Sequence, residues 1–228
     1  MRSAERPLRA VLFDVDGTLV DSNYLHIDAW GRAFRKLGVP IDGWRIHRRL
    51  GMDSAQMLEE LLGDDAEQLS SRASDAHAHF YRKNADRLRA FAGASTLLRE
   101  LGGHGIRTVL ATSASSDELD MLVEALGVGD DGLITTNADD VARAKPHPGL
   151  VEVALERADV AAGDAVFVGD SVWDMIAAKR AGVATIGVLS GGISAGELSD
   201  AGADRIVESV AELVGMTDVP ESAEEEGI

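Results

Sequence analysis

Short apolar runs recur along the chain, at residues 9–13, 106–111, 132–135, 164–169 and 184–189. Most of these runs are continuous rather than alternating, which is typical of strands that are covered on both faces of a sheet. Amphipathic segments with a helical period lie between them, at 93–102, 117–126, 148–158 and 171–181. This alternation predicts βαβ units, and therefore an α/β fold with a doubly wound, mostly parallel, Rossmann-like sheet.

Residues 22–88 follow a different pattern, in which apolar positions repeat with a helical period and no run has the character of a strand. An insert between the first and second strands of a parallel sheet lies at the carboxyl ends of the strands, where ligands bind in such folds. We therefore expect a small all-helical cap at 22–88, on a catalytic core made of 1–21 and 89–218. A helical extension with a purely structural role is the alternative.

The composition is that of a globular protein, with 45% hydrophobic and 27% charged residues in 228. The chain carries 22 Lys and Arg against 39 Asp and Glu, a net charge of −17, which argues against nonspecific nucleic-acid binding. Residues 219–228 predict a disordered acidic tail. No apolar run reaches the ~20 residues that span a bilayer, and the first ten residues lack the apolar segment of a signal peptide. We expect a cytoplasmic protein, monomeric or homodimeric, with no membrane partner.

Two carboxylates follow the first predicted strand, in the sequence AVLFDVDGTLVDS. Asp14 and Asp16 are two positions apart, and residues so spaced point to the same face of an extended chain. Two like charges at that spacing repel each other. A cation is therefore expected to hold them together, and because the chain contains no cysteine, the site is not a zinc–thiolate site.

Polar side chains also lie at or near the ends of the other predicted strands. Thr112 and Ser113 end the second strand, Lys145 precedes a predicted helix, and Asp170 ends the fourth strand with Asp174 one helical turn later. Each residue alone fits a helix cap or a solvated side chain. Because the carboxyl ends of parallel strands meet at one edge of the sheet, their common placement predicts a single crevice.

These segments resemble the four sequence motifs of the haloacid dehalogenase-like hydrolase superfamily. The matching segments are DVDGT at 14–18, LATS at 110–113, KP at 145–146 and GDSVWD at 169–174. The predicted helical insert resembles the cap of the phosphoglycolate phosphatase and beta-phosphoglucomutase branch. The resemblance covers residues 8–213 approximately, which is most of the chain.

The resemblance implies a Mg²⁺-dependent phosphatase that hydrolyses a small-molecule phosphomonoester, phosphoglycolate-like or a sugar phosphate, through an aspartyl-phosphate. Asp14 would be the nucleophile, and Asp16 would protonate the leaving oxygen and then activate water. The carboxylates of Asp14 and Asp170 and the backbone carbonyl of Asp16 would hold Mg²⁺, and Asp174 would bind metal-bound water or Lys145. The phosphoryl group would be bound by Gly17, Thr112, Ser113 and Lys145.

Several predicted cap residues are candidates for substrate selection. The segment 46–52, IHRRLGM, resembles the specificity loop of such caps, and His26 is a position that the mutases share. The candidates are His26, Arg45, His47, Arg48 and Arg49. The basic cluster at 45–49 either recognises a second anionic group on the substrate or is a solvated helix face paired with nearby acids; both interpretations remain open.

Three further features have simpler interpretations. His77 and His79 lie on a polar helical stretch and are expected at the surface. Trp30 and Phe34, four residues apart, are expected to pack inside the cap. The pair at 191–192, Gly-Gly, is expected to form a turn after the fifth strand, and a place beside the phosphate crevice is the alternative.

Other activities within the superfamily fit less well. Asp16 argues against a haloalkanoate dehalogenase, which lacks this second carboxylate. A sugar phosphomutase of the beta-phosphoglucomutase type is the alternative, but the Arg that mutase caps carry just after the cap glycine is matched here by Asp53 and Ser54. A phosphonoacetaldehyde hydrolase needs a cap lysine for its Schiff base, and Lys36 and Lys83 lie in no recognisable motif.

A binding protein of a different class is a further alternative. Response-regulator receiver domains place an Asp, a Thr or Ser and a Lys at parallel strand ends with Mg²⁺, and act as phosphoaspartate switches. Such a domain is about half the length of this chain and has no cap. A catalytically silent scaffold would have lost at least one motif residue, and all are present. An enzyme is therefore the favoured interpretation.

Overall fold

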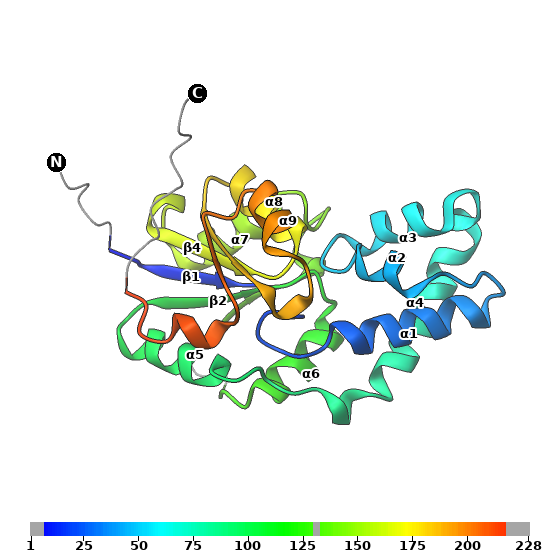
Figure 1. The fold of residues 1–228 in the computed structure, drawn as a ribbon, viewed down its shortest axis with the longest axis horizontal. Helices are drawn as coiled ribbons and strands as arrows, with labels where there is room; N and C mark the ends of the chain where they lie inside the picture. Colours follow the sequence, from blue (N-terminus) through cyan, green and yellow to red (C-terminus); the bar gives the residue numbers. More distant parts are fainter. Residues whose placement is uncertain (1–6, 130–132, 218–228) are drawn as a thin grey trace.

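The core of the protein is a six-stranded parallel sheet with the strand order β3-β2-β1-β4-β5-β6. It is seen in a computed structural model that describes residues 7–129 and 133–217 (Figure 1). The strands are β1 (Ala10–Phe13), β2 (Arg107–Ala111), β3 (Ile134–Thr136), β4 (Ala165–Gly169), β5 (Ala184–Val188) and β6 (Arg205–Val207). The predicted Rossmann-like α/β fold is confirmed. The predicted tail at 219–228 lies outside the described residues.

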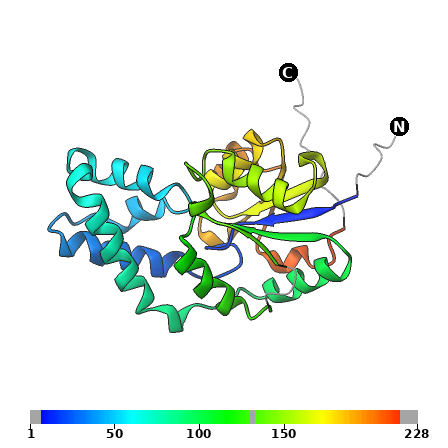
Figure 2. The ribbon, with the colours of Figure 1, turned by 180° about the vertical axis from the view of Figure 1, so that it is seen from behind.

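The continuous apolar runs are explained by two cores, one on each face of the sheet. In β1, Val11 and Phe13 pack into one core with helices α5 (Ala94–Gly103) and α6 (Ser116–Leu126). Ala10 and Leu12 alternate with them and pack into the other core, with α7 (Gly149–Ala158) and α8 (Val172–Arg180). Figures 1 and 2 show these helix pairs on opposite faces. Because β1 is central, both of its faces are apolar.

Local signals in the sequence explain where the core helices begin and end. Ser115 and Glu118 form a capping box that begins α6, and Gly127 ends it in the left-handed conformation with φ of 61°. A second capping box, between Ser171 and Asp174, begins α8. The structure also contains β6 and the short helix α9 (Ala195–Asp200), which the apolar pattern did not predict. A three-residue edge strand is too short to produce a recognisable run.

The segment at 22–88, between β1 and α5, is helical throughout its regular elements, as predicted. It consists of α1 (Asn23–Lys36), α2 (Gly43–His47), α3 (Ser54–Leu62) and α4 (Ala66–Arg82), with 3₁₀ turns η1 (Gly63–Asp65) and η2 (Ala85–Arg87). We call residues 22–88 the cap. It has its own apolar core, in which Trp30 and Phe34 stack with ring centroids 5.5 Å apart, as expected. None of the helices in the described ranges has the length and apolar character needed to span a bilayer.

The remaining 3₁₀ turns connect the core elements: η3 (Ala138–Asp140), η4 (Ala162–Asp164), η5 (Leu189–Gly191) and η6 (Val210–Leu213). Figure 1 shows the cap beyond the carboxyl ends of the strands, on the side to which β1 points. The loops that follow β1, β2, β4 and β5 therefore face the cap. This is the edge at which an open α/β sheet binds its ligands.

Candidate active site

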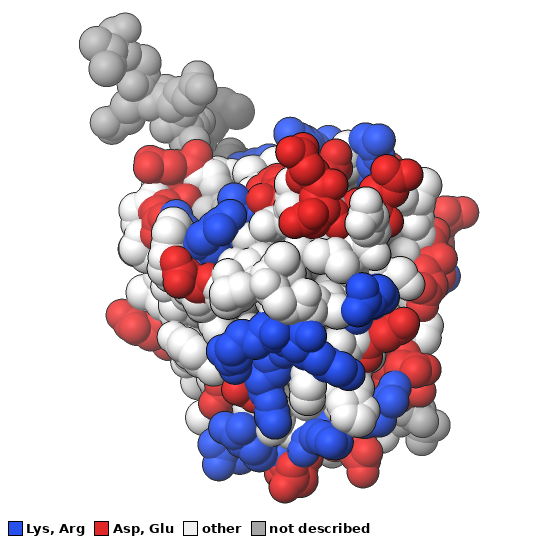
Figure 3. Space-filling view, turned by 90° about the vertical axis from the view of Figure 1, so that its right-hand side faces the viewer, with Lys and Arg blue, Asp and Glu red and all other residues white. Residues whose placement is uncertain are grey.

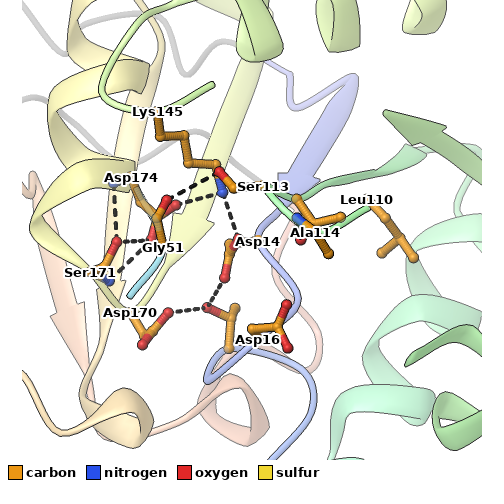
Figure 4. A network of polar contacts seen from close by, with 12 residues as sticks. Asp14, Asp16, Gly51, Leu110, Ser113, Ala114, Lys145, Asp170, Ser171 and Asp174 are labelled. Carbon is orange, nitrogen blue, oxygen red and sulfur yellow. Dashed lines mark hydrogen bonds and ion pairs between the residues drawn. The ribbon is translucent and has the colours of Figure 1, made fainter. Parts of the chain in front are cut away.

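Asp14 lies directly after β1 and is joined to a completely buried lysine. The Nζ atom of Lys145 is 2.5 Å from Oδ1 of Asp14 and 2.7 Å from Oδ1 of Asp174 (Figure 4). Lys145 is 0% exposed and Asp14 is 3% exposed. The loop before α7 supplies the lysine and the first turn of α8 supplies Asp174. Three separate segments therefore bring one ammonium group between two carboxylates.

Asp170, at the end of β4, completes the acidic cluster. Its Oδ1 accepts a hydrogen bond from the Thr18 hydroxyl at 3.1 Å, and its Oδ2 accepts one from the Asn23 side-chain amide at 2.9 Å. Asp174 accepts from the backbone N–H and the hydroxyl of Ser171, at 3.0 and 2.6 Å. One ligand atom each from Asp14, Asp170 and Asp174 lies within 4.8 Å of the others.

This buried cluster contains fewer positive charges than negative ones. Among the described residues, Asp14, Asp170 and Asp174 are buried carboxylates that share a single ammonium group, Lys145. Burial, opposed by Lys145, raises the pKa of Asp14 well above its usual value, and Asp174 and Asp170 raise it further. Burial and Asp174 raise the pKa of Asp170 to about 7. Burial alone would lower the pKa of Lys145, but Asp14 and Asp174 outweigh it and raise the pKa.

The donor set fits a hard divalent cation, because it consists of buried carboxylate oxygens that carry two uncompensated negative charges. Within the cluster, Oδ1 of Asp174 contacts Lys145 and Oδ2 accepts from Ser171, so Asp174 helps to hold the lysine. Ligation of the cation by the carboxylates of Asp14 and Asp170 and by the backbone carbonyl of Asp16 stays a prediction.

Asp16 is held from the side of the cap. Its Oδ1 accepts a hydrogen bond from the Ser22 hydroxyl at 2.5 Å and lies 3.1 Å from Nε2 of His26. Burial acts to raise the pKa of Asp16, but the charge and hydrogen bonds of His26, with the Ser22 bond, lower it overall. Because β1 ends at Phe13, strand geometry does not dictate where Asp16 points. The two carboxylates have separate partners, Lys145 for Asp14 and His26 for Asp16.

Behind His26, a chain of polar contacts crosses from the cap to the core. Nδ1 of His26 lies 3.0 Å from Nε2 of His77, and Nδ1 of His77 lies 3.5 Å from Oε1 of Glu118 in α6. Burial lowers the pKa of His26 but Asp16 raises it overall, whereas burial and His26 lower the pKa of His77. Of the two imidazoles, His26 is therefore the one whose surroundings favour the charged form, and His77 the one whose surroundings favour the neutral form.

The expectation that His77 is a surface residue is wrong. His77 is 5% exposed and stacks on Trp30, with ring centroids 4.0 Å apart, whereas His79 is exposed as expected. Ala73, His77 and Tyr81 recur every four residues on the buried face of α4. This four-residue spacing is visible in the sequence and indicates a buried helix face. The polar residues between these positions make the face hard to recognise.

Thr112 and Ser113 follow β2 and line a cleft between cap and core. The cleft has a volume of about 410 Å³, and Asp14 and Asp16 lie on its wall. The Thr112 hydroxyl accepts a hydrogen bond from the Ala114 N–H at 3.1 Å. The Ser113 hydroxyl donates one to the carbonyl of a cap residue at 3.1 Å. Asp14, Asp16, Thr112 and Ser113 thus line one cleft that the cap helps to form, and the buried Lys145 contacts Asp14 without lining the cleft itself.

Comparison with known proteins places this arrangement in a family. The sequence profile of haloacid dehalogenase-like hydrolases matches residues 8–182. The chain is a haloacid dehalogenase-like hydrolase. It is 30% identical to the phosphoglycolate phosphatase of Rhodospirillum rubrum, with 90% of this chain and 89% of that protein covered. It is 31% identical to the validoxylamine A 7'-phosphate phosphatase of Streptomyces hygroscopicus subsp. limoneus, with 79% and 85% covered.

A solved structure supports the same assignment. The crystal structure of a hydrolase from Pseudomonas syringae superimposes with a TM-score of 0.86 and is 33% identical, and the match covers 91% of this chain and 97% of that one. The resemblance that the four motifs indicated is therefore confirmed. The expected enzyme class, a phosphatase of the haloacid dehalogenase-like family, is confirmed with it.

The basic cluster of the hydrolase's cap is divided between two locations. His47 Nε2 lies 2.8 Å from the Gly191 carbonyl, and Arg48 forms an ion pair with Glu197 at the start of α9, so both residues join the cap to the core. Arg49 lines the cleft, and its Nε donates to Oε2 of Glu60 at 3.0 Å. Arg45 is not among the residues described as lining the cleft.

Positive charge also collects outside the cleft. Figure 3 shows Lys and Arg side chains gathered in the middle of the outer face of the cap. On α1, Arg32, Arg35 and Lys36 are exposed. These three side chains do not line the cleft, so they are not candidates for contact with a ligand bound there.

Glycine residues allow the close packing around Asp170. Gly17 has a φ of 76°, and a Cβ there would lie 2.2 Å from Nδ2 of Asn23 and 2.5 Å from Oδ2 of Asp170. Gly191 lies in the turn expected after β5, as the last residue of η5, and it is also buried against Asp170. Asn23 and Thr18, which bind Asp170, were not assigned from the sequence, because contacts between segments so distant along the chain leave no local pattern.

A methyl group at position 191 should disable the site without unfolding the protein. The Cβ of Gly191→Ala would lie 1.6 Å from Oδ2 of Asp170, so the carboxylate has to move. We expect phosphatase activity to fall by roughly a hundredfold, as for displacements of about 1 Å in other active sites. Gly196→Ala in α9 is the matched control, because nothing lies within 4 Å of its Cβ. Equal activity of the two variants would contradict this view of Asp170.

Proposed function

We propose that the protein is a Mg²⁺-dependent phosphatase that hydrolyses a small-molecule phosphomonoester through an aspartyl-phosphate on Asp14. The observation that carries the proposal is the buried contact between Asp14 and Lys145, in a cluster that lacks two positive charges. A buried carboxylate beside an ammonium group is poised to attack an electrophile whose negative oxygens the same ammonium group binds.

In the first step, the Asp14 carboxylate attacks phosphorus in line with the ester oxygen, and the bond from phosphorus to that oxygen breaks. Lys145 and the Thr112 hydroxyl stabilise the negative charge on the transferring oxygens. Asp16 gives its proton to the departing alcohol. The substrate dianion favours this protonated form, because like charge raises the pKa of a neighbouring carboxyl group.

In the second step, Asp16 takes a proton from a water molecule as that water attacks the aspartyl-phosphate. The bond between phosphorus and the Asp14 oxygen breaks, so phosphate leaves and the carboxylate is restored. His26 holds Asp16 through a 3.1 Å contact and so keeps it directed at the proton-transfer path in both steps.

The proposed Mg²⁺ site consists of the carboxylates of Asp14 and Asp170 and the backbone carbonyl of Asp16. When bound, the ion supplies charge neutralisation between Asp14 and the phosphoryl oxygens. Thr18 and Asn23 hold Asp170 in place for it, at 3.1 and 2.9 Å. These contacts fix the carboxylate before the ion arrives.

The proposed substrate is small, phosphoglycolate-like or a sugar phosphate, in keeping with a cleft of about 410 Å³. We propose that the cap opens to admit it and closes to exclude water, as lids of other enzymes do. Arg49 lies at the cap wall of the cleft and is the proposed contact for groups remote from phosphorus. The proposed location of the reaction is the cytoplasm.

The first test is the requirement for a metal ion. Chelation with EDTA should abolish phosphate release, because the acidic cluster then lacks the charge that lets a phosphate dianion enter, and excess Mg²⁺ should restore it. Calcium should inhibit, since its higher coordination number engages both oxygens of Asp14. The measurement is phosphate release from a panel of phosphomonoesters. Full activity in excess EDTA would refute the proposed metal site.

The second test separates the two carboxylates that follow β1. Asp14→Asn should abolish turnover of every ester, because no nucleophile remains. Asp16→Asn should also be severely impaired, yet with p-nitrophenyl phosphate, whose leaving group needs no proton, it should still form the phosphoenzyme. Acid quenching and mass measurement of the intact protein detect that adduct. Substantial turnover by Asp14→Asn would favour direct attack by water.

The third test concerns Arg49. Arg49→Ala should raise KM for the best substrate by about ten- to a hundredfold, which corresponds to one hydrogen bond to a charged group, roughly 1.5–3 kcal/mol. KM for p-nitrophenyl phosphate should change little, because this ester offers Arg49 no second polar group. Arg35→Ala, at an exposed position of α1, is the control. An equal rise in KM for both esters would mean that Arg49 supports the fold and does not bind the substrate.

A further inference from the structure

One short segment of the cap contacts three of the loops that carry catalytic residues. The carbonyl of Gly51 accepts the 3.1 Å hydrogen bond from Ser113 after β2, and the N–H of Asp53 donates to the carbonyl of Lys145 at 2.7 Å. A Cβ on Gly51 would lie 2.8 Å from Oγ of Ser171, so the backbone of the cap rests directly on the loop after β4. Figure 4 shows Gly51 among these residues.

Asp53 has two separate functions in this contact. Its Oδ1 accepts hydrogen bonds from the N–H groups of Ala55 and Gln56 at 3.0 and 3.1 Å, and so caps α3. Its Oδ2 accepts a hydrogen bond from the N–H of Ala144 in the core at 2.9 Å. An ordinary helix cap needs only the first set of bonds. The second oxygen binds the core and not α3.

Together these bonds fix the backbone on both sides of the catalytic lysine. Asp53 binds the N–H of Ala144 and the carbonyl of Lys145, which are the two ends of the dipeptide that contains the catalytic lysine. The loop belongs to no strand or helix, so no ladder of backbone hydrogen bonds fixes it. From the core, Arg180 donates to the Pro146 carbonyl at 2.8 Å, the loop makes a turn of its own, and the Lys145 side chain is held by Asp14 and Asp174.

We propose that Asp53 is a positioning residue that couples the docking of α3 to the placement of Lys145 in the active site. When α3 is docked, its cap residue holds the lysine backbone, and the ammonium group lies between Asp14 and Asp174. When α3 departs, both hydrogen bonds are lost together and the loop is free to shift. The catalytic consequence of this coupling rests on the proposed phosphatase function, whereas the structural consequence does not.

The test is Asp53→Ser, compared with Asp42→Ser. Serine still caps α3, because its hydroxyl accepts from the first-turn N–H groups, but it is too short to reach the Ala144 N–H as well. Asp42 is the exposed N-cap residue of α2 and, as described, accepts no capping hydrogen bond with its side chain. Should Asp53→Ser fail to fold, Asp53→Asn replaces it, because asparagine also caps helices but its NH₂ group cannot accept from Ala144.

Two readouts are needed, with Mg²⁺ present. Hydrogen exchange should show faster exchange of the Ala144 amide in Asp53→Ser, with the amides of α3 unchanged. The kcat should fall about ten- to a hundredfold, the size expected for one bond to a charged group, and by the same factor for p-nitrophenyl phosphate and for the best larger ester. The melting temperature should match that of Asp42→Ser.

The outcomes distinguish this inference from the proposed function. Unchanged exchange at Ala144 or unchanged kcat in Asp53→Ser would overturn the inference. A loss confined to KM of the larger ester would also overturn it, because Asp53 would then act on the substrate and not on Lys145. If the wild-type protein releases phosphate from no ester, the proposed function fails, and exchange at Ala144 still decides whether Asp53 holds the loop.

Discussion

The structure depends on one electrostatic constraint: three carboxylates and one ammonium group are buried together at the edge of the sheet. Burying such charges is costly, and breaking a buried ion pair typically costs a further 3–5 kcal/mol or so. Every neighbouring feature reduces that cost. Thr18, Asn23 and Ser171 donate hydrogen bonds to the carboxylates. The charge that remains uncompensated is the physical basis for the divalent cation proposed above.

The fold makes this concentration of charge possible. Because the central strands β1 and β4 are apolar on both faces, two cores fix the middle of the sheet, and the acidic residues follow the strand ends. These two strands deliver Asp14 and Asp170 close together, since Phe13 pairs with Val168, one position before Asp14 and two positions before Asp170. The cap supplies two further contacts to the residues at this edge of the sheet. His26 lies beside Asp16, and Asp53 binds the loop that carries Lys145.

The sequence was sufficient to predict the parallel sheet, the helical cap and the convergence of Asp14, Thr112, Lys145 and Asp170, because strand ends and motif spacing are local patterns. It was not sufficient for residues whose roles depend on contacts between distant segments. His77 was assigned to the surface, although α4 turns it against α1 and α6. The turn at Gly191 is readable from the sequence, but the contact of Gly191 with Asp170 is not. The second function of Asp53, beyond its helix cap, likewise depends on a loop some 90 residues away.

The central claim is that phosphoryl transfer proceeds through a covalent intermediate on Asp14, and its most direct test is the stereochemical course at phosphorus. A phosphorothioate ester made chiral with oxygen isotopes can be hydrolysed in isotopically labelled water and the product's configuration determined. Two successive in-line displacements, first by Asp14 and then by water, predict net retention of configuration. Net inversion would mean that water attacks the substrate directly, and would contradict the account.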